Sequence, residues 1–255
     1  RVLKKRIIPI QLLINNRLVK TIKFDKYRDV GNPISSSKIY NDSDADELVF
    51  LNISRDVRKV EPLISLIKSV SEVCFMPLSV GGGIKNLKDV EKLIKNGADK
   101  IIINSEVFKN RALIKEVAKN FGSQAIIVSI DAKKNITNGK YSLYSNCGRK
   151  EETTSLEDHV NRCVDEGAGE ILINSINADG TMEGYDLFLI KTVSDLAKVP
   201  VIGCGGAGNF NHMRDVFLKT KVSALACGSL FNFGDNNPIR AKAFLKNYNL
   251  PFKAI

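Results

Sequence analysis

The 255-residue sequence lacks the features that mark membrane and secreted proteins. No apolar run reaches the roughly 18 residues that indicate a membrane-spanning helix, so we expect no membrane segment. The basic start, from Arg1 to Arg6, is soon followed by Gln11 and Asn15, which is too polar for the core of a signal peptide. We therefore expect a cytoplasmic protein.

Metal and disulfide signatures are also scarce. The five cysteines form no CxxC pair and are odd in number, which disfavours a disulfide framework or a zinc cluster. The two histidines, His159 and His212, lie in polar, helix-like stretches, and we expect both on the surface. We accordingly expect no metal site, no cofactor and no histidine-based catalytic triad.

The sequence does have an excess of positive charge, with a formal net charge of +10. The lysines are scattered and do not gather into a patch with interleaved aromatic residues, so no nucleic-acid partner is expected. An overall positive field would still attract a phosphorylated small molecule.

Eight short apolar runs alternate with amphipathic stretches. The runs lack polar alternation, which is typical of strands buried on both faces of a parallel sheet. They are residues 6–13, 48–53, 75–80, 100–103, 125–130, 170–173, 199–202 and 223–227. Asn110 is placed to cap a helix that extends through Val117, and Asn237 before Pro238 is a helix-start signal. The alternation predicts an α/β fold, a single (β/α)8 barrel over residues 1–255.

The chain also resembles itself at a shift of 123 residues, from Ala45 to Ala168. The similar segments are residues 45–54 and 168–177, and residues 81–83 and 204–206. This repeat predicts two similar half-barrels, residues 1–123 and 124–255.

Glycine-rich loops follow several predicted strands. Residues 203–208 and the pair 228–229 follow the last two strands, where (β/α)8 barrels often bind phosphate through backbone N–H groups. By the repeat, residues 81–83 with Asn104 and Ser105 form a second site. Two phosphate sites across one barrel mouth predict a ligand with a phosphate at each end.

Two alternatives remain for these loops. Gly203, Gly205 and Gly208 also satisfy the GxGxxG pattern of dinucleotide sites. We disfavour a nicotinamide cofactor, because no acidic residue follows at the usual spacing of about 20 residues. The simpler alternative is that the glycines form tight turns without a ligand.

Acid–base chemistry in such a barrel needs a titratable group at a strand end. Asp131 ends the fifth run and is the clearest candidate, and Asp179 is the second. Either could instead serve a loop or turn. The repeat would place a partner for Asp131 within residues 9–13, which contain no acid.

These motifs together resemble the HisF family, the cyclase subunits of imidazole glycerol phosphate synthase, over essentially the whole chain. The motifs are residues 6–9, 45–51, 80–84, 97–100, 121–124, 130–133, 167–172, 179–181 and 205–208. The resemblance implies a (β/α)8 barrel that binds a HisH glutaminase at the amino-terminal face of its strands. Ammonia would pass through the barrel to a ribulosyl substrate with two phosphates.

The resemblance also assigns roles to individual residues. The phosphate- and substrate-binding set, with the Gly228 argued above, is Lys20, Gly82, Gly83, Asn104, Ser105, Asp179, Gly180, Gly205, Gly206, Gly228 and Ser229. The ammonia gate is Arg6, Glu47, Lys100 and Glu170, and Asp99 would contact the glutaminase.

The chain departs from the family where the chemistry occurs. The family uses two aspartates as general acid and base; the fifth-strand one is Asp131, but the first-strand one aligns with Leu12, or with Gln11 if the alignment slips by one. Further acids of the family's mouth are replaced by Asn52 and Asn177.

Our leading hypothesis is therefore a HisF-like subunit of a glutamine amidotransferase. It would form a heterodimer with a HisH-like glutaminase, conduct ammonia, bind a bis-phosphate or nucleotide-linked ligand, and have diverged toward amidination of surface-polysaccharide sugars. One alternative is an authentic cyclase in which Asp131 acts alone or with water. The other is a non-catalytic scaffold for the glutaminase.

Overall fold

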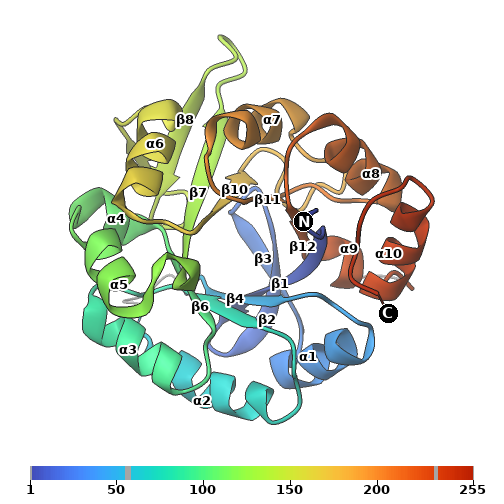
Figure 1. The fold of residues 1–255 in the computed structure, drawn as a ribbon, viewed down its shortest axis with the longest axis horizontal. Helices are drawn as coiled ribbons and strands as arrows, with labels where there is room; N and C mark the ends of the chain where they lie inside the picture. The colour runs from blue at the N-terminus through green and yellow to red at the C-terminus, as the bar shows by residue number, and fades with distance from the viewer. Residues whose placement is uncertain (1, 55–58, 233–234, 255) are drawn as a thin grey trace.

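A closed ring of parallel strands forms the centre of the molecule (Figure 1). The computed structural model describes residues 2–54, 59–232 and 235–254, so both ends of the predicted domain, residues 1 and 255, lie outside it. In ring order the strands are β1 (Arg6–Ile14), β4 (Leu48–Asn52), β5 (Leu78–Gly81), β6 (Lys100–Ile103), β7 (Ile126–Lys134), β10 (Glu170–Ser175), β11 (Val201–Cys204) and β12 (Ala224–Cys227). Pairing of β12 with β1 closes the ring, which confirms the predicted (β/α)8 barrel.

Helices connect successive barrel strands and surround the ring (Figure 1). They are α1 (Pro33–Asp42), α2 (Glu61–Ser71), α3 (Leu87–Lys95), α4 (Ser105–Lys109), α5 (Leu113–Phe121), α6 (Leu156–Glu166), α7 (Leu187–Leu196), α8 (Phe210–Lys219), α9 (Ser229–Asn232) and α10 (Pro238–Lys246), with a 3-10 turn at Ser123–Ala125. Among the described residues, no helix is both long and apolar enough to cross a membrane.

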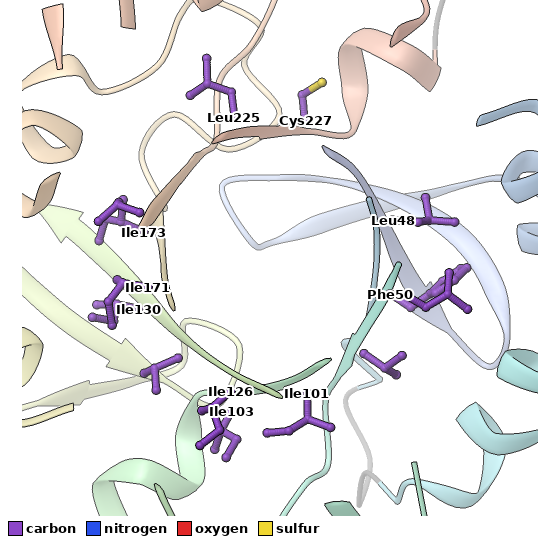
Figure 2. Close-up of a cluster of buried hydrophobic side chains, with 14 of the residues drawn as sticks. Leu48, Phe50, Ile101, Ile103, Ile126, Ile130, Ile171, Ile173, Leu225 and Cys227 are labelled. Atoms are coloured by element: carbon purple, nitrogen blue, oxygen red, sulfur yellow. The ribbon is translucent and has the colours of Figure 1, made fainter. Parts of the chain in front are cut away.

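Each barrel strand buries both of its faces. On β7, Ile126 and Ile130 pack outward against the helices, whereas Ile127 belongs to a separate cluster inside the ring. Figure 2 shows the outward set, with the labelled side chains directed away from the barrel axis. Each buried side chain of this size stabilises the fold by about 1.5–3 kcal/mol. Burial on both faces explains why the runs lack polar alternation.

Two antiparallel extensions rise from the ring and were not predicted. β1 continues past its expected end and turns at Asn15 and Asn16 into β2 (Arg17–Ile22) and β3 (Lys26–Gly31). Both asparagines have left-handed φ angles, 50° and 58°, which two-residue hairpin turns favour. β7 likewise continues into β8 (Tyr141–Ser145) and β9 (Lys150–Glu152).

Two local predictions need correction. Asn110 does not cap a helix that begins beside it; its side chain accepts from the backbone of Ala112, and α5 begins at Leu113. Asn237 does cap α10, as predicted, by accepting from Arg240 N. The division of the barrel at residue 123 stays a prediction.

The expectation that His159 is a surface residue is wrong. Its side chain is fully buried between α6 and α4 and stacks on Phe108 with the ring centroids 4.3 Å apart. The polar neighbours that suggested exposure lie on the other side of α6, because successive helical residues face different directions. Burial, together with the charge of the neighbouring Arg162, lowers the pKa of His159 to about 4. His212 is half-buried, and its Nδ1 accepts from Gly208 N at 3.1 Å.

Candidate functional site

A cavity of about 400 Å³ occupies the mouth of the barrel, at the carboxyl ends of the strands. Apolar side chains of the inner cluster, such as Ile10 and Ile102, line its lower part. All the predicted phosphate- and substrate-binding residues line it: Lys20, Gly82, Gly83, Asn104, Ser105, Asp179, Gly180, Gly205, Gly206, Gly228 and Ser229. The fold therefore brings together the residues that the sequence proposed, while their roles in binding stay predictions.

Asp131 is held at the inner end of this cavity. It lies on β7 with only 6% of its surface exposed, and Asn104 Nδ2 donates to its Oδ2 at 2.7 Å. Asn174 on β10 is its in-register neighbour and faces the same cavity. A buried carboxylate between two amide side chains is placed to bind a hydrogen-bond donor on a ligand.

Of Leu12 and Gln11, the two residues that the resemblance offers for the missing acid, only Leu12 faces the mouth. Leu12 lines the cavity, whereas Gln11 is fully buried outside the ring and donates through Nε2 to Ser37 Oγ of α1 at 2.9 Å. Alternation along β1 forces the two side chains to opposite faces. Because β1 and β7 lie half a ring apart, Leu12 faces Asp131 across the mouth.

The other acid-to-amide positions behave differently from one another. Asn52 lines the cavity and accepts from Ser54 N and Oγ at 3.1 and 2.7 Å. Asn177 lies outside the lining and bonds the backbone of Lys134, accepting from its N at 2.7 Å. Of these two asparagines, only Asn52 therefore lies where it can contact a ligand in the mouth.

Asp179 anchors the β2–β3 hairpin to the mouth. Its Oδ2 accepts from Thr21 Oγ1 at 2.8 Å and from Phe24 N at 3.1 Å. Burial raises the pKa of Asp179, although both hydrogen bonds and the charge of Lys20 act in the opposite direction. Gly180 follows with φ +69°, and a Cβ there would lie 2.0 Å from Thr21 O, so only glycine permits the approach of the hairpin.

The phosphate-type loops adopt backbone conformations that require glycine. Gly82 has φ +97°, and a Cβ there would lie 2.2 Å from Asn52 O. Gly206 has φ +105°, and its Cβ would lie 2.1 Å from Gly184 O. Packing alone therefore explains these glycines, and the turn-only alternative stays open. Ser105 Oγ accepts from Asn146 N at 2.8 Å, and its own hydroxyl hydrogen takes no part in that bond.

The sequence did not predict that both antiparallel extensions contribute to the mouth. Thr21, Phe24 and Tyr27 come from the β2–β3 hairpin, and Ser145 and Arg149 come from the β8–β9 region. In the sequence, the available signal for the second turn was Asn146-Cys147-Gly148; the first two of these residues adopt left-handed φ angles.

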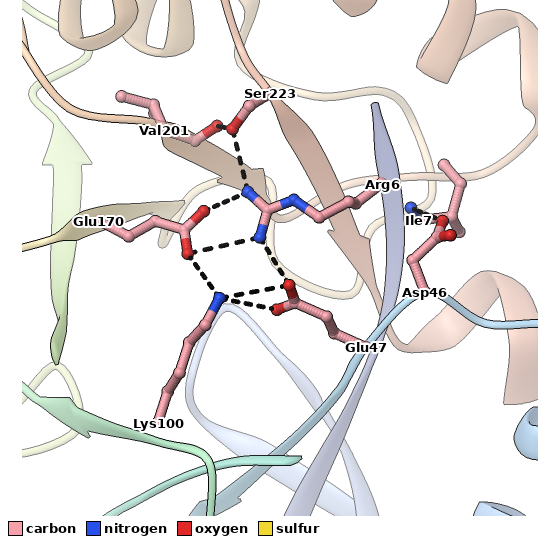
Figure 3. A network of polar contacts seen from close by, with 8 residues as sticks. All are labelled: Arg6, Ile7, Asp46, Glu47, Lys100, Glu170, Val201 and Ser223. Carbon is pink, nitrogen blue, oxygen red and sulfur yellow. Dashed lines mark hydrogen bonds and ion pairs between the residues drawn. The ribbon is translucent and has the colours of Figure 1, made fainter. Parts of the chain in front are cut away.

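A ring of alternating charges closes the opposite end of the barrel (Figure 3). Arg6 Nη1 lies 2.8 Å from Glu47 Oε1, and Arg6 Nη2 pairs with Glu170. Lys100 Nζ lies 3.2 Å from Glu47 and 3.3 Å from Glu170. Burial opposes the charge of Arg6, but the two carboxylates outweigh it and raise its pKa. The four predicted gate residues thus form one network, and each cation bridges both acids.

Asp99 lies beside this ring at the start of β6. Its Oδ2 accepts from Leu78 N at 2.8 Å while the side chain stays exposed on the amino-terminal face. This position suits the predicted contact with a partner. In the described parts of the chain, no group of three or more His, Cys, Asp or Glu side chains could hold a metal ion.

Comparisons with known proteins agree with this geometry. A family model described as "Histidine biosynthesis protein" matches residues 6–237. The imidazole glycerol phosphate synthase subunit HisF of Leuconostoc mesenteroides subsp. mesenteroides is 43% identical over 245 residues, which cover 96% of this chain and 96% of that protein. The match spans the barrel from the charged ring to the mouth loops and confirms the resemblance. The chain belongs to the HisF family of histidine biosynthesis proteins.

Proposed function

We propose that the chain is the barrel subunit of a glutamine amidotransferase that receives ammonia from a HisH-like glutaminase and has lost most of the family's cyclase chemistry. One observation carries the proposal: the charged ring at one end is complete, while Leu12 faces Asp131 at the other. An intact conduit beside an incomplete acid–base pair indicates a change of reaction, with nitrogen transfer kept.

The charged ring supports the ammonia route. Two buried carboxylates and two half-buried cations are costly to collect at a barrel end, because desolvation offsets much of their attraction. Asp99 on the same face supports docking of the glutaminase there.

The mouth supports a phosphorylated ligand. Gly82 and Ser105 lie on one side of the cavity, and Gly205 and Ser229 lie on the other, with Lys20 on the hairpin. Backbone N–H groups beside hydroxyls suit phosphate oxygens. The two sides support a bis-phosphate or nucleotide-linked ligand that spans the cavity.

The cyclase itself would be slow. Loss of one general acid or base costs about 10²–10⁴-fold in rate, and leucine at position 12 can neither give nor take a proton. We infer that the ammonia serves another acceptor, and that amidination of a surface-polysaccharide sugar by a separate enzyme is its use.

The test is reconstitution with a HisH-type glutaminase. We expect a heterodimer whose glutamine hydrolysis rises when a bis-phosphate ligand is added. Arg6→Met should disrupt the gate and so uncouple glutamine hydrolysis from nitrogen transfer. Arg17→Met, which removes an exposed ion pair with Asp29 on the hairpin, should not. If no complex forms and glutamine hydrolysis is not stimulated, the proposal is refuted. A complex without nitrogen transfer would leave only a scaffold.

A second candidate is an authentic cyclase of histidine biosynthesis. Two observations favour it: the identity to a protein named as a synthase subunit, and the raised pKa of Asp179, a second carboxyl of the mouth able to hold a proton. Turnover of the ribulosyl substrate with ammonium chloride, lost in Asp179→Asn, would establish it.

A further inference from the structure

Unsatisfied polar atoms mark one place in the mouth. Among the described residues, the buried side-chain atoms without a hydrogen-bond partner are Gln11 Oε1, Ser79 Oγ, Asn104 Oδ1 and Asn174 Oδ1. Buried polar groups are almost always paired, so unpartnered atoms of side chains that line a cavity are candidates to bind a ligand. The last two of these atoms belong to side chains that lie on either side of Asp131.

The three side chains come from consecutive strands of the ring. Asn104 directly follows β6, Asp131 lies on β7, and Asn174 lies on β10 in register with Asp131. All three line the mouth cavity. Asn104 Nδ2 donates to Asp131 Oδ2 at 2.7 Å, so the carboxylate fixes the amide orientation and leaves Asn104 Oδ1 as the acceptor.

The cluster therefore presents acceptors to a guest. Two amide oxygens and one carboxylate favour a small molecule that carries several N–H or O–H donors and a positive charge. Calcium takes six to eight oxygen ligands, more than this cluster offers. An ammonium ion has four donors in tetrahedral arrangement, so three can reach these side chains while the fourth faces the cavity.

The cluster also lies on the path from the charged ring. Lys100 and Asn104 are four residues apart along β6 and its end, and Glu170 and Asn174 are four apart on β10. At about 3.3 Å per residue this is about 13 Å. The even spacing puts each pair on the same, inward face. Ser79, in register with Lys100, carries a third unsatisfied atom inside the ring.

We propose that Asn104, Asp131 and Asn174 form an ammonium-binding site at the exit of the barrel. The site would hold the incoming nitrogen as ammonium beside the phosphorylated ligand, with three of its four N–H groups donated to the two amide oxygens and the carboxylate. This role rests on the proposed ammonia route, but binding of the ion does not.

The test uses thallium(I), which resembles ammonium in size and charge and scatters anomalously. Crystals of the full chain grown without ammonium are soaked in thallium acetate. We expect an anomalous peak in contact with Asn104 Oδ1 and Asn174 Oδ1, removed by ammonium acetate and retained in sodium acetate. Absence of this peak, or its persistence in excess ammonium, overturns the proposal.

A variant pair supplies the control. Asn174→Leu keeps the size of the side chain and removes the acceptor, so the peak should disappear. Asn177→Leu changes an asparagine three residues further along the chain that lies outside the cavity, so the peak should remain. If Asn174→Leu does not fold, the melting temperature of the unmodified chain decides: it should rise in ammonium chloride relative to equal choline chloride.

The outcome is separable from that of the proposed function. A thallium peak without stimulation of a glutaminase keeps the ion site and refutes the ammonia route. Stimulated glutaminase without a peak keeps the route and refutes the site.

Discussion

Replacing Leu12 with aspartate returns a carboxylate to the position on β1 that faces Asp131 across the mouth. Leu12 is half-buried and lines the cavity, so the new carboxylate would lie at the ligand and stay in contact with water. A positioned general acid or base contributes about 10²–10⁴-fold in rate. This corresponds to about 3–5 kcal/mol of activation free energy, at about 1.4 kcal/mol per factor of ten.

The assay is conversion of the ribulosyl substrate with ammonium chloride, followed by the release of imidazole product. We expect Leu12→Asp to raise the rate by about two orders of magnitude or more above the unmodified chain. The matched control is Gln11→Asp, because Gln11 is fully buried against Ser37 outside the ring. There the carboxylate cannot reach the ligand, and burying it without its hydrogen bond should cost about 1–3 kcal/mol of stability.

Two results would refute this reasoning. A gain of activity in Gln11→Asp would mean that the register of β1 differs from the one described. No gain in Leu12→Asp, in a variant that still binds the substrate, would mean that the rest of the mouth has lost the cyclase reaction for another reason, such as the amide at Asn52.

Three further predictions concern the ring, a buried histidine and the hairpin. Arg6→Met leaves Glu47 and Glu170 with Lys100 alone, and urea unfolding should show a loss of about 3–5 kcal/mol; an unchanged midpoint would contradict a cooperative ring. The pKa of His159 is about 4 in the folded protein and 6.5 for the free side chain. Its contribution to the free energy of unfolding is therefore complete above pH 6.5 and is lost as the pH falls toward 4. Stability should drop by about 3 kcal/mol over that window, and His159→Phe should flatten the drop. Gly180→Ala puts a Cβ against the hairpin backbone, so ligand affinity measured by calorimetry should fall while the barrel still unfolds cooperatively.

The barrel could be predicted from the sequence because its signals are local. Apolar runs without polar alternation specify strands buried on both faces, and their alternation with helical patterns leaves few folds. The glycine loops and Asp131 were found for the same reason, since each lies at or directly after the end of an apolar run in the sequence. The gate residues came from the family resemblance alone, because no local pattern relates Arg6 to Glu170.

Tertiary structure alone decided which side chains meet. Leu12 and Gln11 are adjacent in sequence, and only the register of β1 between β12 and β4 sends one to the mouth and the other to α1. His159 is buried because α4 packs over α6, which its polar neighbours could not show. The sequence determined the elements through contacts close along the chain. The direction in which each side chain points depends on pairing between distant strands. Only the closed ring could therefore place two amide oxygens beside Asp131.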